Sequence, residues 1–153
     1  MRYAIAVGSN RGDREQTLAR AAEMLAADGH VTIEAQSALL ENPAVGGPEG
    51  QDDFLNGAWV VATRLGAHQL LLRLRRIEDA LGRVRSVRNG PRTIDLDLLL
   101  AEDGTTIEST LLSLPHPRLH ERHFVLQPLR EVAGGWQHPI FSCTVEELWQ
   151  RLG

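Results

Sequence analysis

The spacing of hydrophobic residues predicts strands and helices in alternation along most of the chain. Short apolar runs bounded by glycine, proline or asparagine are typical of strands. Apolar residues three or four positions apart are typical of one face of a helix. On these patterns we expect strands at residues 3–7, 31–40, 54–63 and 93–100, and helices at residues 13–29, 67–81, 124–132 and 145–152.

The ends of the two earlier helices carry recognisable signals. Asp13 stands where it can cap the first helix, and Gly29 is expected at its C′ position. Gly82 is expected to close the second helix. The order strand, helix, strand, strand, helix, strand favours an α+β fold, a ferredoxin-like αβα sandwich with a central, mainly antiparallel sheet. The length of 153 residues fits one domain spanning 1–153.

The charged residues narrow the classes of function. The net charge is −4 and no basic run is present, so nucleic acid is not expected as a partner. All 16 basic residues are arginines. The absence of lysine excludes a Walker lysine, the strand lysine of protein kinases and a Schiff-base lysine. Any phosphate chemistry must therefore use arginine, backbone amides and metal.

Cysteine content and apolar run length indicate the compartment. Cys143 is the single cysteine, so an internal disulfide and a thiolate zinc cluster are excluded, and we expect it to be buried and structural. The apolar runs are shorter than the roughly 18–20 residues of a membrane helix, and a strand-like run stands where a signal peptide would be. We therefore expect a soluble, cytoplasmic protein with no membrane partner.

The run GPRTIDLDLLL carries the strongest chemical signal in the chain. Side chains on a strand alternate between its faces, so Asp95 and Asp97 share one face, about 7 Å apart between Cα atoms. Two carboxylates on a rigid element suit Mg²⁺ ions held against a polyphosphate. The same pattern is also typical of a half-exposed antiparallel strand with solvated aspartates. The two interpretations stay open on these residues alone.

Several cationic residues stand near this strand in the sequence. Arg83, Arg85, Arg88 and Arg92 lead into the aspartates through a polar loop at residues 83–89. Arginines in such runs commonly lie on the solvated surface of a protein, but arginine also binds phosphate oxygens bidentately. The segment Pro115-His116-Pro117-Arg118, with Arg122 after it, forms a second cationic loop. His116 could donate to a phosphate or simply hydrogen-bond within its turn.

An aromatic residue and an amide follow a long glycine- and proline-rich loop at residues 42–52. Phe54 and Asn56 share one strand face by the two-residue period. An aromatic ring beside an amide suits recognition of a flat heterocycle, although the pair is also an ordinary strand pattern.

Taken together, these motifs resemble the 6-hydroxymethyl-7,8-dihydropterin pyrophosphokinase family of folate biosynthesis. The segments GSNRGD, NPAVGGPEGQDDFLNG, IEDALGRVR, GPRTIDLDLLL and LPHPRLHERHFVLQPL stand in that family's order and spacing, across residues 4–129. The resemblance implies transfer of the β,γ-pyrophosphoryl group of ATP to the hydroxymethyl oxygen of the pterin, with release of AMP. It implies an enzyme, an ATP-dependent diphosphotransferase, that acts as a monomer on small-molecule substrates.

The resemblance also implies a role for each matching residue. Asp95 and Asp97 would hold two Mg²⁺ ions, and Arg83 and Arg92 would be catalytic with them, carrying the phosphates. The ATP contacts would come from Glu78, Arg83, Arg85, Arg92, Leu98, His116 and Arg122. The pterin contacts would come from Asn42, Pro43, Val45, Phe54, Asn56, Asp95 and Phe124, with the two phenylalanines on either side of the ring.

Two other functions use some of the same residues. A nucleotidyltransferase of the polymerase-β type combines a Gly-Ser turn with a D-x-D strand, but places the two close together in sequence, whereas most of this chain separates them. A non-catalytic ferredoxin-like ligand-binding domain needs neither the aspartate pair nor the arginine cluster. Release of AMP distinguishes the pyrophosphokinase from both.

Overall fold

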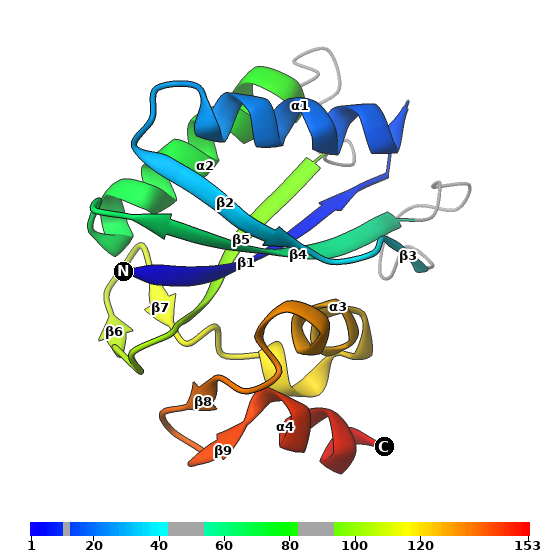
Figure 1. Ribbon diagram of the computed structural model, residues 1–153, viewed down its shortest axis with the longest axis vertical. Helices are drawn as coiled ribbons and strands as arrows, with labels where there is room; N and C mark the ends of the chain where they lie inside the picture. Colours follow the sequence, from blue (N-terminus) through cyan, green and yellow to red (C-terminus); the bar gives the residue numbers. More distant parts are fainter. Residues whose placement is uncertain (11–12, 43–53, 83–93) are drawn as a thin grey trace.

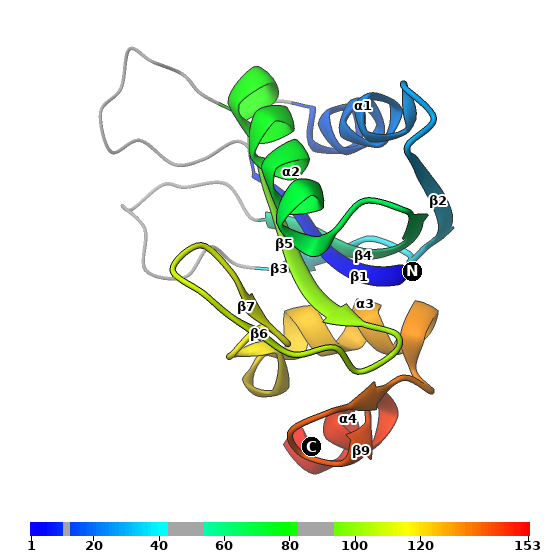
Figure 2. The same cartoon turned by 90° about the vertical axis from the view of Figure 1, so that its left-hand side faces the viewer.

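The computed structural model describes residues 1–10, 13–42, 54–82 and 94–153. It has three layers, seen edge-on in Figure 1: helices α1 and α2 cover one face of a central sheet, and α3 and α4 lie on the other side. Figure 2 shows the same layers from the side. The sandwich predicted from the order of the elements is confirmed.

The central sheet is antiparallel, and most of its strands match the expected positions. Its main strands are β1 (Arg2–Ser9), β2 (Val31–Gln36), β4 (Phe54–Thr63) and β5 (Ile94–Ala101), in the order β2-β4-β1-β5. A short strand, β3 (Leu40–Asn42), also pairs with β4. This order leaves β1 in the middle, between β4 and β5, and leaves β5 at an edge. These four strands, with α1 and α2 between them, follow the ferredoxin-like order.

The strand expected at residues 31–40 is wrong in its extent, because the chain breaks into β2 and β3. The backbone N–H of Ala58 on β4 donates to the Ser37 hydroxyl at 2.9 Å, so a side chain replaces a ladder partner. The backbone N–H of Ala38, the residue after Ser37, donates to Glu131 Oε1 on α3 at 2.9 Å. The ladder therefore lapses between Gln36 and Leu40 and then resumes.

Helices α1 (Arg14–Ala26) and α2 (Ala67–Gly82) pack against one face of the sheet. Asp13 caps α1 as predicted, since its carboxylate accepts from Gln16 N at 3.0 Å. Gly29 was expected at C′, but the C-cap is Ala27, so Gly29 stands one position further on, with a φ of +77°. Gly82 is the last residue of α2 rather than the residue after it.

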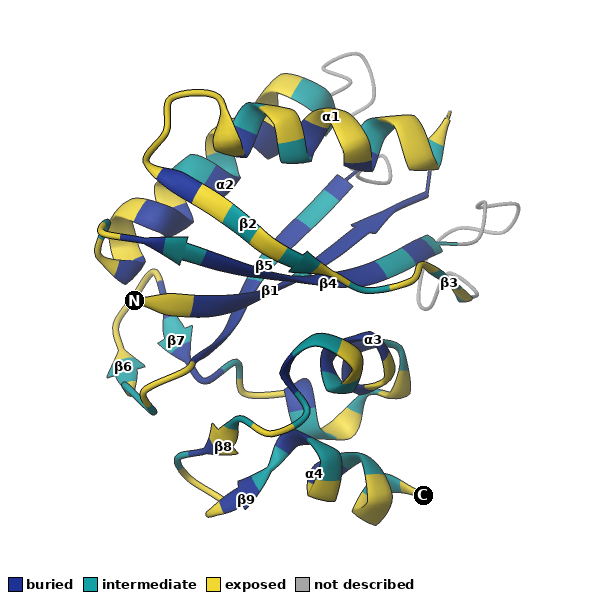
Figure 3. Cartoon of the chain, viewed as in Figure 1, coloured by how far each residue is buried: buried dark blue, intermediate teal, exposed yellow. Residues whose placement is uncertain are grey.

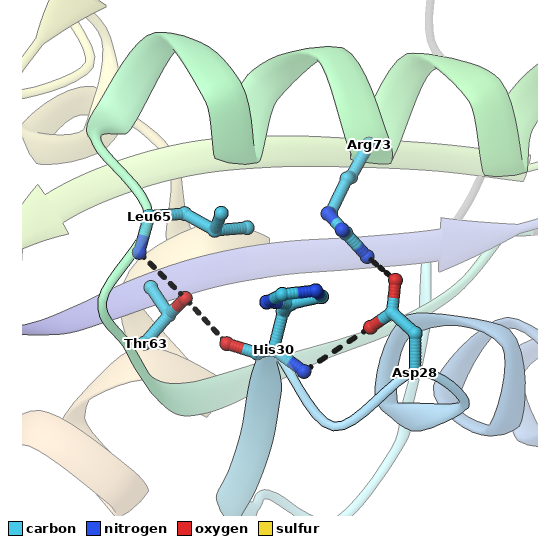
Figure 4. Close-up of polar contacts among 5 residues, drawn as sticks. All are labelled: Asp28, His30, Thr63, Leu65 and Arg73. Atoms are coloured by element: carbon cyan, nitrogen blue, oxygen red, sulfur yellow. Dashed lines mark hydrogen bonds and ion pairs between the residues drawn. The ribbon is translucent and has the colours of Figure 1, made fainter.

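Polar contacts join the turn after α1 to the turn before α2, as Figure 4 shows. The Asp28 carboxylate pairs with Arg73 on α2 and accepts from His30 N. The Thr63 hydroxyl donates to His30 O at 2.7 Å and accepts from Leu65 N at 3.1 Å. These contacts fix the end of the sheet that lies far from the aspartates of β5.

The opposite layer is built after β5 in sequence. It holds α3 (His123–Ala133), α4 (Val145–Leu152) and the 3-10 turn η1 (Leu119–Glu121). Two small hairpins that the sequence pattern did not predict precede and join these helices: β6 (Ile107–Glu108) with β7 (Ser113–Leu114), and β8 (Gln137–His138) with β9 (Cys143–Thr144). Cys143 is buried and free, as expected.

Burial follows the layers in Figure 3, where strands β1, β4 and β5 are mostly dark blue. One apolar core lies between the sheet and α1 and α2, and a second lies between the sheet and α3 and α4. Ala4 and Ala58 are fully buried in the second core, so that side of the sheet has small residues where α3 packs. None of the helices in the described ranges has the length and apolar composition that crossing a bilayer requires.

Candidate active site

Two rows of side chains across the sheet form the floor of a cleft. Gly8 on β1 lies opposite Asn56 on β4 and Asp95 on β5. Two residues back along β1, Ala6 lies opposite Ala58 and Asp97. Residues directly opposite one another share a face of the sheet. The central strand thus supplies only a hydrogen atom at Gly8, between Asn56 and Asp95, and only a methyl group at Ala6, beside Asp97, and a hollow results.

The hollow has a volume of about 610 Å³ and opens beside α3. Its lining comes from β1, β3, β4, β5 and the start of α3, and consists of Ala6, Val7, Gly8, Asn42, Phe54, Asn56, Gly57, Asp95, Asp97, Arg118, Arg122, Phe124 and Val125. Six of the residues predicted for the two substrates are therefore brought together with Asp97: Asn42, Phe54, Asn56, Asp95, Arg122 and Phe124.

Asp95 and Asp97 both face the cleft and are partly exposed, as the alternation predicted. The residues between and beside them, Ile94, Leu96 and Leu98, point the other way into the core under α2 and are buried. Among the described residues, no three His, Cys, Asp or Glu side chains gather into a group that could hold a metal ion. The carboxylate pair fits Mg²⁺, which commonly takes one or two carboxylates and completes its shell with waters and substrate phosphates.

Asn56 lines the cleft. Its side-chain oxygen is buried and has no hydrogen-bond partner within the described part of the chain. Buried polar atoms are nearly always paired, and an unpaired one costs about 1–3 kcal/mol. Phe54 and Phe124 line the same cleft from β4 and α3, so the cleft offers aromatic surface beside the Asn56 amide. The Arg122 guanidinium lies 5.7 Å from the centroid of the Phe124 ring.

His116 lies in a loop that is anchored to β5. Its backbone N–H donates to Leu99 O at 2.8 Å, and its Nδ1 accepts from Arg118 N at 3.2 Å. Burial lowers the pKa of His116, the nearby Arg122 and Arg118 lower it further, and Asp97 acts in the opposite direction. The ring therefore lies within electrostatic reach of the cleft, although it does not line it.

Glu78 and Leu98, both predicted to contact ATP, have other surroundings. Glu78 is buried on α2, where its carboxylate accepts from Arg75 and from the backbone N–H of Leu96. The Leu98 side chain is buried in the core under α2. Neither side chain lines the cleft, and their contact with ATP stays a prediction.

Other predicted site residues lie outside the described part of the chain. These are Pro43, Val45, Arg83, Arg85 and Arg92. The cleft also includes Ala6 and Gly8, which sequence reasoning did not place beside the aspartates, and Arg118, which it named only as part of a cationic loop. The register of β1 against β4 and β5 identifies Ala6 and Gly8 as cleft residues, because it places Gly8 between Asn56 and Asp95 and places Ala6 beside Asp97.

Comparison with known proteins identifies the family of this chain. Residues 4–134 match the model of a family described as 7,8-dihydro-6-hydroxymethylpterin-pyrophosphokinase (HPPK). The chain is 47% identical over 128 residues to the 2-amino-4-hydroxy-6-hydroxymethyldihydropteridine pyrophosphokinase of Bacillus subtilis, covering 84% of this chain and 75% of that protein. It is 46% identical over 129 residues to the enzyme of the same name from Methylorubrum extorquens, covering 84% of this chain and 80% of that one.

A solved structure supports the fold. The wild-type HPPK-DHPS of Plasmodium falciparum, crystallised with SDX-DHP, superposes with a TM-score of 0.70 at 14% identity, over 98% of this chain and 43% of that longer one. The family match, the sequence identity and the similarity of fold lead to the same conclusion. The chain belongs to the 7,8-dihydro-6-hydroxymethylpterin-pyrophosphokinase family, as its motifs had indicated.

Proposed function

We propose that the protein transfers the pyrophosphoryl group of ATP to the hydroxymethyl group of 6-hydroxymethyl-7,8-dihydropterin, releasing AMP, as a step of folate biosynthesis. One observation carries the proposal: a single cleft holds the Asn56 amide on one side of β1 and a pair of carboxylates, Asp95 and Asp97, on the other. The first feature suits a polar heterocycle and the second suits a metal-bound polyphosphate. The names of the relatives support the same reaction.

The pterin would lie between Phe54 and Phe124, with its polar edge on Asn56. Asn42 pairs with Phe54 at the end of β3, so it stands beside the same pocket. Asn42, Pro43 and Val45 would complete the pocket. Asp95 lies directly across Gly8 from Asn56, which would bring the pterin's reacting arm toward the aspartates.

Asp95 and Asp97 would hold Mg²⁺, and two ions are proposed. The chemistry that bound Mg²⁺ supplies is polarisation of phosphoryl oxygens and neutralisation of their charge. The chain's own part is alignment: β5 holds the carboxylates on one face of a rigid sheet, and Arg122 with Arg118 supplies cations beside them. Arg83, Arg85 and Arg92 would bind the phosphates, with Arg83 and Arg92 acting in catalysis. Such a transfer depends on positioning and charge stabilisation more than on a strong base.

We further propose that the chain acts as a monomer in the cytoplasm, with no nucleic acid or membrane partner. Its net charge of −4 and its single, buried cysteine support this proposal. Light scattering of the purified protein at several concentrations tests the oligomeric state. A mass near 16.9 kDa at all of them is expected.

The products identify the reaction. The protein is incubated with ATP, Mg²⁺ and hydroxymethyl-dihydropterin, and the mixture is separated by chromatography with phosphorus NMR of the pterin fraction. AMP and pterin diphosphate are expected in equal amounts, with no AMP formed when the pterin is left out. Free pyrophosphate with an adenylylated pterin would indicate a nucleotidyltransferase, and an unchanged mixture would indicate a binding domain.

Gly8→Ala tests the floor of the cleft. A Cβ atom at Gly8 would lie 2.8 Å from Asn56 Nδ2 and 3.6 Å from Phe54 Cδ1, so the amide must move. Since small misplacements of a substrate-positioning group are costly, kcat/KM for the pterin is expected to fall about tenfold or more, with KM for ATP little changed. Gly66→Ala is the matched control, because its Cβ would meet only Gln69 Oε1, at 3.7 Å. Equal kinetics in the two variants would contradict the assignment of this floor.

The pKa of His116 reports its coupling to the aspartates. Burial holds the pKa of His116 below the usual value of 6.5, so the ring is expected to be neutral at pH 7. Asp97 favours the charged ring, so Asp97→Asn should lower the pKa of His116 further. NMR titration of the ring carbons in both proteins measures the change. A pKa of His116 that is raised or unmoved in Asp97→Asn would contradict the proximity.

A further inference from the structure

The backbone between the two aspartates lies at an open edge of the sheet. β5 pairs with β1 on one side and has no strand on the other among the described residues. Successive residues of an antiparallel strand direct their N–H and C=O groups to opposite edges. Leu96, which separates Asp95 from Asp97, directs both of its groups outward, toward α2.

Two side chains of α2 take the place of the missing strand. Glu78 Oε2 accepts from Leu96 N, and Arg75 Nη1 donates to Leu96 O, each at 2.8 Å. Arg75 Nη1 also donates to Glu78 Oε1 at 2.8 Å, which closes the arrangement. Glu78 is only 7% exposed, so these bonds form largely away from water. We call this pair of side chains the α2 clamp.

The clamp reaches the cleft through a second nitrogen of the same arginine. Arg75 Nη2 lies 3.5 Å from Asp97 Oδ1. Arg75 therefore fixes both the peptide unit at Leu96 and the carboxylate of the next residue. Its planar fork of donors allows this, whereas a lysine ammonium offers a single point of charge.

We infer that Arg75 is a positioning residue for the metal-binding carboxylates, because it holds β5 at Leu96 and Asp97 in the geometry that the reaction needs. The inference rests on the proposed function for its kinetic consequences. Residues that orient metal ligands without touching the metal typically change activity or metal affinity by about 10–100-fold when removed. The pterin would meet Phe54, Asn56 and Phe124 instead, so its KM should hardly depend on Arg75.

The test compares Arg75→Gln with Arg76→Gln, in which the neighbouring residue loses the same charge from an exposed position on the same helix. For Arg75→Gln, kcat in saturating Mg²⁺ is expected to fall about 10–100-fold, with the KM of the pterin within about threefold of the parent. Arg76→Gln should match the parent. A change confined to the KM of ATP would show that Arg75 contacts the nucleotide and would overturn the inference, as would equal kcat values in the two variants.

Two further readouts keep the test decisive. Hydrogen exchange of the Leu96 amide, followed by NMR, needs no substrate and is expected to be faster in Arg75→Gln than in Arg76→Gln. If the parent lacks pyrophosphokinase activity but this exchange differs, the proposed function fails while the clamp stands. Arg75→Lys keeps the charge beside the buried Glu78, so it should fold even if Arg75→Gln does not. Its kcat should still fall at least about fivefold, because the fork is lost, and a parental kcat in Arg75→Lys would overturn the inference.

Discussion

Replacing Asp97 with asparagine is expected to lower kcat by about 10³-fold while the fold stays intact. Metal-assisted charge stabilisation contributes several kcal/mol to the transition state, and each 1.36 kcal/mol is a tenfold change in rate. The Asp97 side chain is 43% exposed and faces the cleft, so its loss opens no cavity in the core. Steady-state kinetics across a range of Mg²⁺ concentrations measure the effect, with circular dichroism as the check on folding.

The matched control for this variant is Glu102→Gln. Glu102 follows β5 directly and is exposed at the far end of the strand, where it pairs with Arg2. This control should keep parental kinetics. If Asp97→Asn retained more than a tenth of the parental kcat at saturating Mg²⁺, the carboxylate would not be a ligand of the reacting metal.

Asn56→Ala is expected to show opposite effects on activity and on stability. The lost amide would leave polar groups of the bound pterin unpaired, and two such groups at about 1–3 kcal/mol each correspond to a fall of about 30-fold to 3 × 10⁴-fold in kcat/KM for the pterin. The Asn56 oxygen is buried without a partner among the residues that the structure describes, so removing it takes away a cost of folding. The free energy of unfolding should therefore stay the same or rise.

Chemical denaturation and initial-rate kinetics on the same preparations measure both effects. ATP binding serves as the internal control, since the amide lies on the pterin side of the cleft and its loss should leave ATP affinity unchanged. A clear fall in the free energy of unfolding would mean that Asn56 is a structural residue. An unchanged kcat/KM for the pterin would mean that the ring binds elsewhere.

The sequence predicts best what depends on local periodicity. The two-residue period of a strand places Asp95 and Asp97 on one face and Leu96 on the other, whatever the strand packs against. The same period relates Phe54 to Asn56. The limits of β4 and α4 agree with the pattern, because apolar runs and flanking turn residues mark both.

Features that depend on distant partners could not be predicted in this way. The break between β2 and β3 needs Glu131, which is far away in sequence. The positions of Gly8 and Ala6 in the cleft follow from strand register, and the surroundings of Glu78 follow from β5 being an edge strand. The hairpins β6–β7 and β8–β9 have strands of two residues each, too short for a periodic signal.

The most direct test is a crystal structure of the protein with Mg²⁺, a non-hydrolysable ATP analogue and 6-hydroxymethyl-7,8-dihydropterin. The pterin ring is expected between Phe54 and Phe124, hydrogen-bonded to Asn56, with Asp95 and Asp97 holding Mg²⁺ and the β-phosphate directed toward the hydroxymethyl group. Ligands bound outside this cleft, or a cleft holding the nucleotide with its α-phosphate rather than its β-phosphate toward the pterin, would contradict the proposed reaction.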